Sequence, residues 1–326
     1  MKKNFILSFY CKRIVYSSFC LVFIFTASSY GQLSGTAGAF SRVGFGARGM
    51  GMGNALTAVS NGELPGYYNS ASPSVITHSS GALSFGILSL DRSLNTIYYA
   101  QPIDTTAGLA VGIINSGVTN IDGRDADGYH TENYSVSENQ FSFSFSKRFN
   151  KLSLGITSKI YYYKLFKNLS STAVGIDIGA LYRITPRLTA GIVVKDLMAK
   201  YKWDTSSEEL YGQNGNSTTE RFPQLKIAGL SYLFGDHLGI ISGEIEFSDN
   251  AVKILRSGIE IYLLDILTLR AGIDGWNMND KTSAHPSFGF SILIPEISYK
   301  PAVHYAYVVE PYNVFAMHCI SLSVSL

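Results

Sequence analysis

Residues 141–146 read FSFSFS, a strict alternation of an aromatic and a small polar side chain. Successive side chains of a β-strand point to opposite faces of its sheet, so this stretch predicts a strand with one apolar and one polar face. The next segment repeats the pattern, with apolar residues at Leu152, Leu154, Ile156, Ile160 and Tyr162. The chain is rich in Tyr (21), Phe (19) and Gly (31) and only 15% charged, which favours an all-β fold.

The alternation recurs to the last residue, and two kinds of β-protein could produce it. A soluble sandwich would turn the apolar faces inward, whereas a transmembrane antiparallel β-barrel would turn them outward to lipid. Strands of soluble proteins usually have about five or six residues, and many runs here are longer. They match the roughly 9 to 11 residues that a tilted strand needs to cross a bilayer. We count about 14 candidate strands, beginning near residues 80, 94, 106, 136, 151, 170, 187, 222, 237, 252, 266, 283, 296 and 313.

The connections between these segments alternate in length. Tight ones fall at Ile103-Asp104, Asn150-Lys151, Thr185-Pro186, Gly235-Asp236, Leu264-Asp265 and Pro295. The others are mostly longer, and the longest are Thr119 to Ser135 and Lys200 to Arg221. Short turns at one end and long loops at the other are typical of outer-membrane barrels, whose turns face the periplasm. The pattern predicts such a barrel, with both chain ends periplasmic.

The first residues have the features of an export signal. Basic residues precede an apolar run from Phe19 to Ala27, and small residues at 29 and 31 predict cleavage before Gln32, so residues 1–31 are expected to be a signal peptide. Cleavage removes four positive charges and no negative ones, so the net charge moves from +2 to −2. No basic footprint for nucleic acid remains. Cys319 is then the single cysteine, which excludes an intramolecular disulfide.

Three local patterns could carry chemistry. Residues 44–49 match GxGxxG, but no strand–helix–strand unit frames them, so close backbone packing explains them better than dinucleotide binding. His285 and Ser287 lie two apart, hence on one strand face, where a hydrolase could use them as base and nucleophile, although no orienting carboxylate stands out. The segment DGRDADG (122–128) could hold Ca²⁺, although a solvated acidic loop explains it better, and the histidines show no metal-ligand spacing. We therefore expect no metal, no cofactor and no enzyme activity.

Charged residues fall on the polar faces of the later segments. They are mixed in sign and comprise Lys159, Lys195, Glu244, Glu246, Glu260, Arg270, Asp274 and Lys300. An ion filter would favour one sign of charge. We therefore expect these side chains to line the lumen of the barrel as a self-neutralising network.

One stretch near the start differs from the rest. Residues 35–75 are rich in small side chains, and their only ionisable residues are Arg42, Arg48 and Glu63. The stretch contains Gly35-Thr-Ala-Gly38, Gly46-Ala-Arg-Gly-Met-Gly-Met-Gly53, Asn54-Ala-Leu-Thr-Ala-Val59 and Tyr67-Tyr-Asn-Ser-Ala71. These motifs resemble the N-terminal region of the PorV/PorQ family, which is itself similar to FadL-type outer-membrane transporters. Ser70 stands where that family has proline.

The resemblance implies a 14-stranded barrel whose N-terminal segment occupies the lumen as a glycine-rich plug with a short helix. We accordingly expect a signal peptide (1–31), a plug (32–78) and a transmembrane barrel (79–326). A plug or gating role is implied for Gly46, Arg48, Gly49, Gly51, Gly53 and Asn69. In a FadL-like channel, contacts with a hydrophobic ligand are implied for Phe40, Phe45, Met50, Met52 and Leu56.

Two functions are implied by the same resemblance. PorV-like members are non-enzymatic accessories of type IX protein secretion that bind the translocon or a cargo protein, and this is the leading hypothesis. FadL-like members take up hydrophobic small molecules such as long-chain fatty acids, which is the alternative. Either function places the chain in the outer membrane of a Gram-negative bacterium, in contact with outer-membrane lipid.

Arg48 is the central charge of this almost uncharged stretch. A charge threaded into a barrel needs a partner, because an unpaired ion is costly to remove from water. We therefore expect Arg48 to pair with a lumen carboxylate such as Glu244, Glu246 or Asp274. Loss of the arginine should then loosen the plug rather than abolish a reaction.

Overall fold

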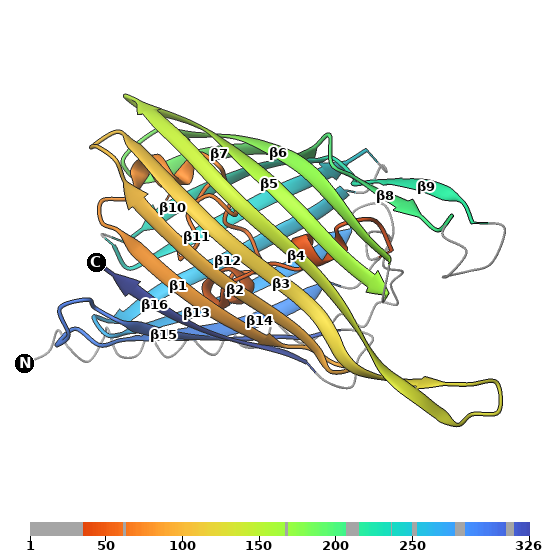
Figure 1. Cartoon of the computed structure of the whole chain (residues 1–326). Helices are drawn as coiled ribbons and strands as arrows, with labels where there is room; N and C mark the ends of the chain where they lie inside the picture. The colour runs from red at the N-terminus through yellow and green to blue at the C-terminus, as the bar shows by residue number, and fades with distance from the viewer. Residues whose placement is uncertain are drawn as a thin grey trace, which may run out of the picture.

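The chain forms a closed antiparallel β-barrel, seen from the side in Figure 1. The computed structural model describes residues 35–60, 63–166, 169–206, 215–235, 237–249, 253–277, 284–310 and 316–326. The expected signal peptide lies outside these residues. The wall has the strand order β1-β16-β15-β14-β13-β12-β11-β10-β7-β6-β5-β4-β3-β2, and β1 pairs with β16 to close it. The prediction of an all-β transmembrane barrel with about 14 strands is thus confirmed.

The wall strands begin close to most of the predicted positions. They are β1 (Ser80–Ile87), β2 (Arg92–Pro102), β3 (Ala107–Arg124), β4 (His130–Phe149), β5 (Leu152–Phe166), β6 (Leu169–Arg183), β7 (Leu188–Leu197), β10 (Leu225–Phe234), β11 (Gly239–Ser248), β12 (Lys253–Leu264), β13 (Leu267–Asn277), β14 (His285–Leu293), β15 (Ala302–Val308) and β16 (Met317–Ser325). Two further strands, β8 (Lys200–Asp204) and β9 (Ser217–Arg221), pair only with each other. Among the described residues, no helix has the length and apolarity needed to cross a membrane.

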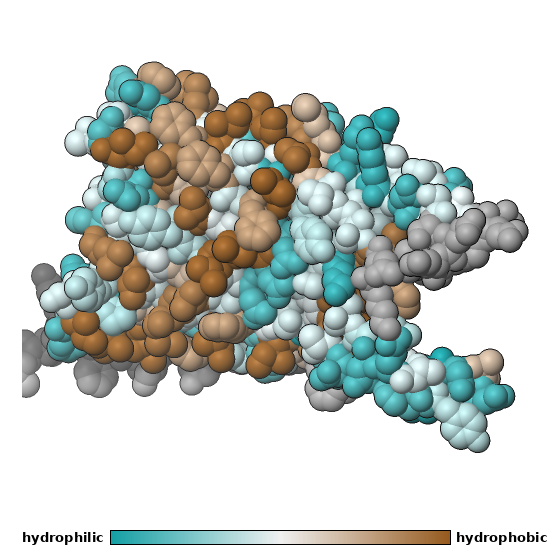
Figure 2. Space-filling model, viewed as in Figure 1, coloured by the Kyte–Doolittle hydropathy of each residue, from teal (hydrophilic) through white to brown (hydrophobic). Residues whose placement is uncertain are grey.

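Side chains alternate between lipid and lumen along the wall strands, as the period of two predicts. In the stretch FSFSFS, Phe143 is 50% exposed on the outside while Ser144 is fully buried on the inside. On β5, Ile156 is 48% exposed and Thr157 is 1% exposed. Figure 2 shows the outward side chains as a hydrophobic band, bordered by a hydrophilic zone where β3 and β4 project. The apolar faces therefore point to lipid, and the sandwich alternative is excluded.

The tight connections all lie at one end of the barrel, which also carries the C-terminus. They fall where the sequence predicted them, between β2 and β3, β4 and β5, β6 and β7, β10 and β11, and β12 and β13. Leu326 donates its backbone N–H to Ser79 O over 2.7 Å, which fixes the start and the end of the wall side by side. In the β2–β3 turn, hydrogen bonds from the Thr106 N–H and hydroxyl hold the pKa of Asp104 below its usual range.

The connection between β14 and β15 differs from the prediction. The strand expected from residue 296 begins only at Ala302, because residues 294–301 form a turn that contains Pro295 and Pro301. A proline has no N–H to give to a strand ladder, so the ladder resumes after the second one. Lys300 is therefore exposed in this turn, with φ of 40°, and the expectation that it lines the lumen was wrong.

The opposite end carries the long connections, and much of their length is strand. β3 and β4 continue past the wall as a ribbon, visible at the lower right of Figure 1. The acidic segment 122–128 lies at its tip, where Asp122 pairs with Arg124 and His130 at 2.6 Å each and Asp125 accepts backbone hydrogen bonds within the turn. No group of three or more His, Cys, Asp or Glu residues is placed to hold a metal in the parts of the chain that the structure covers.

Candidate functional site in the lumen

Residues 35–60 and 63–79, called the plug here, run through the inside of the barrel (Figure 1). They contain two short 3-10 helices, η1 (Ala39–Arg42) and η2 (Ser72–Val75), and the short helix α2 (Ala47–Gly51). Helix α2 contacts β13 to β16, whereas η2 contacts β2 to β5. The plug therefore reaches from one side of the wall to the other, with the short helix that was expected.

Arg48 of α2 pairs with a carboxylate of the wall, as predicted, although with a different residue from those expected. Its guanidinium bonds the Glu260 carboxylate of β12 through two nitrogens, Nε to Oε2 at 2.8 Å and Nη2 to Oε1 at 2.7 Å. Arg270 and Tyr262 of the wall bond the same carboxylate. Arg48 is 8% and Glu260 1% exposed, so water screens this pair little.

The three carboxylates expected to bind Arg48 instead surround Arg256 of β12. The Arg256 guanidinium lies 3.2 Å from Glu244, 2.8 Å from Glu246 and 2.5 Å from Asp274. The wall thus neutralises these acids with an arginine of its own. The prediction that Arg48 pairs with one of them was wrong.

The two remaining predicted lumen lysines also have partners. Lys159 lies 2.7 Å from Asp177 and 3.1 Å from Asp196. The Lys195 ammonium stands over the ring of Tyr67, 4.9 Å from its centroid, which is a cation–π distance. These contacts agree with a self-neutralising lumen rather than a filter for ions of one sign.

Backbone N–H groups of the plug bond directly to wall side chains. The Ala47 N–H donates to Ser321 Oγ (2.7 Å), the Gly53 N–H to Ser287 Oγ (3.2 Å) and the Thr57 N–H to Glu244 Oε2 (3.0 Å). These N–H groups are buried, so each needs an acceptor. Small hydroxyl side chains on the inner face meet that need without filling the lumen, which explains the serines of β14 and β16.

The hydrolase alternative does not match this arrangement. Ser287 is 1% exposed, and its hydroxyl accepts the Gly53 N–H of the plug. Asp274 lies opposite His285 in the β13–β14 register, but its carboxylate is bonded to Arg256 and to the plug residue Asn54. In the described chain, no hydrogen bond joins His285 to Ser287. Ser287 therefore helps to seat the plug instead of serving as a nucleophile.

The predicted plug glycines serve close packing. Gly46, with φ of 76°, precedes α2, and Gly49 and Gly51 lie within it. Gly53 has φ of 58°, a left-handed conformation that glycine adopts without strain. A Cβ on the wall residue Gly272 would overlap the backbone of Gly53, so the plug reaches van der Waals contact with the wall only because both residues lack side chains.

Asn69 ties two parts of the plug to the wall. Its Nδ2 donates to Thr57 O at 2.8 Å and to Ala180 O of β6 at 3.1 Å, while its Oδ1 accepts the Ala71 N–H. Ser70, which replaces the proline of the PorV/PorQ motif, accepts a hydrogen bond from Thr157 of β5 at 2.8 Å. A proline would lack this hydroxyl, so the departure from the motif provides an additional wall contact.

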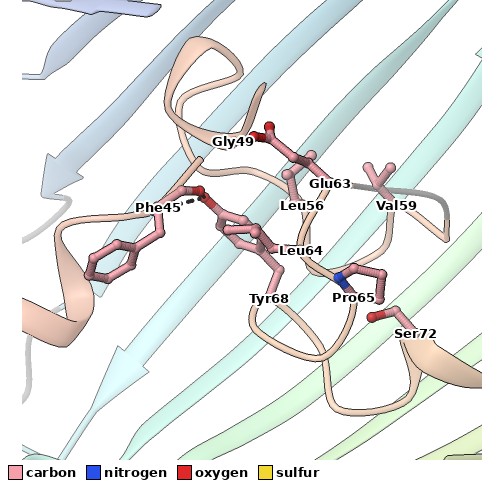
Figure 3. A pocket seen from close by; sticks show the side chains of 9 residues that line it. All are labelled: Phe45, Gly49, Leu56, Val59, Glu63, Leu64, Pro65, Tyr68 and Ser72. Carbon is pink, nitrogen blue, oxygen red and sulfur yellow. Dashed lines mark hydrogen bonds between the residues drawn. The ribbon is translucent and has the colours of Figure 1, made fainter. Parts of the chain in front are cut away.

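The apolar residues proposed as ligand contacts are all buried, at 6% exposure or less, but they do not share one pocket. Phe45 and Leu56 line a cavity of about 20 Å³ inside the plug, shown in Figure 3. Phe40 and Met50 belong to the main apolar core, and Met52 packs with Leu56 in a smaller one. The cavity is mostly apolar, and its other lining residues are Gly49, Val59, Glu63, Leu64, Pro65, Tyr68 and Ser72.

An aromatic cluster covers the plug at the end with the long connections. The ring of Phe222, which follows β9, lies 4.7 Å from that of Tyr161 and 4.9 Å from that of Tyr201, centroid to centroid. Tyr161 also meets Phe40 of η1, and Tyr201 meets Trp203. Aromatic rings next to the β8–β9 sheet thus reach the plug through Tyr161 and Phe40.

Two residues of this site were missed from the sequence. The Tyr68 hydroxyl lies 2.8 Å from both Phe45 O and Asn54 Oδ1, and so joins three segments of the plug (Figure 3 draws its bond to Phe45). Arg256 organises the acidic side of the lumen. It precedes Glu260 by four residues, hence on the same strand face, and this spacing could have revealed it.

No protein-family model matches the chain, and no curated protein matches it. Solved structures of similar shape exist. CymD, described as a monoaromatic hydrocarbon channel, superposes with a TM-score of 0.61 at 15% identity, over 87% of this chain and 97% of its own. The toluene transporter TodX of Pseudomonas putida gives 0.59 at 11% identity, over 93% and 98%. A FadL homologue of Pseudomonas aeruginosa gives 0.62 at 12% identity, over 87% and 98%.

The fold is similar to that of FadL-type channels. Identities this low establish the fold and nothing finer. The FadL-like part of the resemblance noted in residues 35–75 is therefore supported. The PorV/PorQ part is not supported by these comparisons.

Proposed function

We propose that the protein is an outer-membrane channel that admits hydrophobic small molecules past its plug. The observation that carries this proposal is the apolar interior of the plug, where Phe45 and Leu56 border a small cavity. A channel for ions or sugars would need a polar, water-filled path. The hydrocarbon channels named above share the fold and support a cargo of this class. The tight turns and both chain ends would then face the periplasm.

The plug has to move for any such cargo to pass. The cavity holds about 20 Å³, room for about one water molecule, whereas pockets for small organic ligands enclose about 300–1,000 Å³. Passage therefore requires that α2 or the segment after it leaves the wall. The Arg48–Glu260 pair and the backbone contacts of Ala47, Gly53 and Thr57 are the bonds that would break.

A reversible tether tests this proposal. Ala47→Cys and Ser321→Cys, in a Cys319→Ser background, place two thiols where the plug touches β16. Cross-linking them with a short thiol reagent should stop the uptake of a fluorescent long-chain fatty acid and of a monoaromatic hydrocarbon into proteoliposomes, and reductive release should restore it. Each single-cysteine variant should transport equally well with and without the reagent. Uptake that persists through a complete cross-link, or is absent for both probes in the wild type, would refute the channel.

A second candidate is an accessory role in type IX secretion. The feature that favours it is the β3–β4 ribbon, which projects from the wall and offers an exposed surface to a protein partner. The hydrocarbon channels reported above support the first candidate better. A pull-down from solubilised outer membrane separates the two, because a secretion accessory should bring down a translocon or cargo protein and a deletion of residues 119–135 should abolish that capture.

A further inference from the structure

Two exposed lysines flank a phenylalanine on the lipid-facing side of the wall. In the strand register, Phe247 of β11 pairs with Lys226 of β10 on one side and with Lys253 of β12 on the other. All three are exposed and share the outward face with Leu230 and Leu255. β10 and β12 begin at this level and β11 finishes there, so the row lies at the end with the long connections.

The spacing of the two lysines suits a single phosphate group. Neighbouring strands lie about 4.8 Å apart, so the backbones of Lys226 and Lys253, two strands apart, are separated by roughly 10 Å. Flexible four-carbon stems let both ammonium groups converge over Phe247. Neither lysine has an ion pair within the described chain. Asp249 follows the end of β11, farther from the apolar band, and offsets at most one of the two charges.

In the wall beneath this row, two small outward residues lie side by side between larger apolar ones. The next outward row consists of Ala228, Ile245, Leu255 and Trp276, and the one after it of Leu230, Gly243, Ser257 and Ile273. In that second row, Gly243 and Ser257 are small, while Leu230 and Ile273 on either side are 54% and 38% exposed. A Cβ at Gly243 would meet only Arg256 O within 4 Å, at 3.8 Å, so the space outside it is open.

We propose that this sector binds a membrane lipid with a phosphate headgroup. The phosphate lies between the ammonium groups of Lys226 and Lys253, and one acyl chain descends along Gly243 and Ser257. Trp276, 49% exposed and paired with Leu255, lies at the interfacial level that tryptophan favours and marks the headgroup region. Each lysine contributes about fivefold to the affinity for an anionic lipid, and the pair about 30-fold.

Trp276 is also the reporter for the experiment. The chain has 2 tryptophans, so Trp203→Phe leaves Trp276 as the single tryptophan. The full barrel, in nanodiscs of phosphatidylcholine, is titrated with brominated phosphatidylglycerol, which quenches a tryptophan that it touches. A parallel titration with brominated phosphatidylcholine measures the quenching expected when the site does not prefer one lipid over the other. With both lysines present, we expect phosphatidylglycerol to be enriched at Trp276 about 30-fold. In Lys226→Ala or Lys253→Ala the enrichment should be about fivefold smaller, and in the double variant there should be none.

The matched control is Lys200→Ala with Lys202→Ala, which removes two positive charges from β8 at the same end of the barrel. Its enrichment should equal that of the wild type, which shows that net charge alone is not responsible. Equal quenching by the two brominated lipids, or an unchanged double variant, overturns the proposal. Loss of the preference in millimolar inorganic phosphate shows a site for free anions and overturns it as well. Heat-modifiable gel mobility verifies that each variant is folded.

Discussion

Replacing Arg48 by alanine should loosen the plug while the wall stays intact. The change removes two charge-assisted hydrogen bonds to Glu260, each worth about 1.5–3 kcal/mol. Breaking a buried ion pair commonly costs about 3–5 kcal/mol, but Glu260 keeps Arg270 and Tyr262 as partners. We therefore expect about 2–3 kcal/mol, which raises the population of the released plug roughly 30- to 150-fold.

Hydrogen–deuterium exchange in nanodiscs measures this population directly. Amides of residues 46–56 should exchange faster in Arg48→Ala by the same factor, because local opening governs their exchange. Wall peptides such as 154–160 should not change, since their hydrogen bonds lie between strands. Conductance in planar bilayers gives a second measurement, in which the variant should show longer or more frequent openings.

Arg48→Lys is the matched control for charge. Lysine keeps the positive charge but cannot make the paired contact of a guanidinium with a carboxylate. Its exchange rates should therefore lie between those of the wild type and of Arg48→Ala. Unchanged exchange and unchanged conductance in Arg48→Ala would refute the reasoning, and so would equal acceleration of the wall peptides, which would indicate unfolding of the whole barrel.

Three further outcomes are expected. Glu260→Gln should loosen the plug more than Arg48→Ala does, because it leaves two buried arginines without their shared carboxylate; hydrogen exchange ranks the variants, and the reverse order contradicts this. Gly272→Ala should lower the stability by about 1–3 kcal/mol, because its Cβ meets the plug backbone, whereas Gly243→Ala on the outer face should leave it unchanged. Thermal unfolding midpoints compare the two variants, and equal midpoints would count against the close contact. The pKa of Asp104, measured by NMR titration, should lie below the usual value of about 3.9. Its stabilisation of the turn is then full at neutral pH and is lost as the pH falls through that lowered pKa, whereas a pKa at the usual value would contradict this.

The fold was predictable from the sequence because a strand has only two faces. Period-two alternation assigned Phe143 to the lipid and Ser144 to the lumen, and the structure places them there. Alternating connection lengths then separated an end with tight turns from an end with long connections, and the structure shows the same separation. The failure at Lys300 has a local cause, since two prolines in one connection postponed a strand that alternation alone placed too early.

The same alternation could not identify the partner of Arg48. Alternation gives the face of a residue but not its height in the wall relative to a separate segment of the chain. Glu244 and Glu260 both face the lumen, and only the strand register and the path of the plug decide which one meets Arg48. Glu244 has Arg256 as its ionic partner, a contact between neighbouring strands of the wall that needs no plug.

The plug is held by the Arg48–Glu260 pair and by several weaker contacts that can break separately. The N–H groups of Ala47 and Gly53 bond to serine hydroxyls of β16 and β14, at about 1 kcal/mol net each. The N–H of Thr57 bonds to the Glu244 carboxylate of β11, at about 1.5–3 kcal/mol. Because these acceptors lie on different strands, the plug can leave one sector of the wall while it stays bound to the others. Partial displacement therefore costs less than ejection, because only the hydrogen bonds to one sector of the wall have to break.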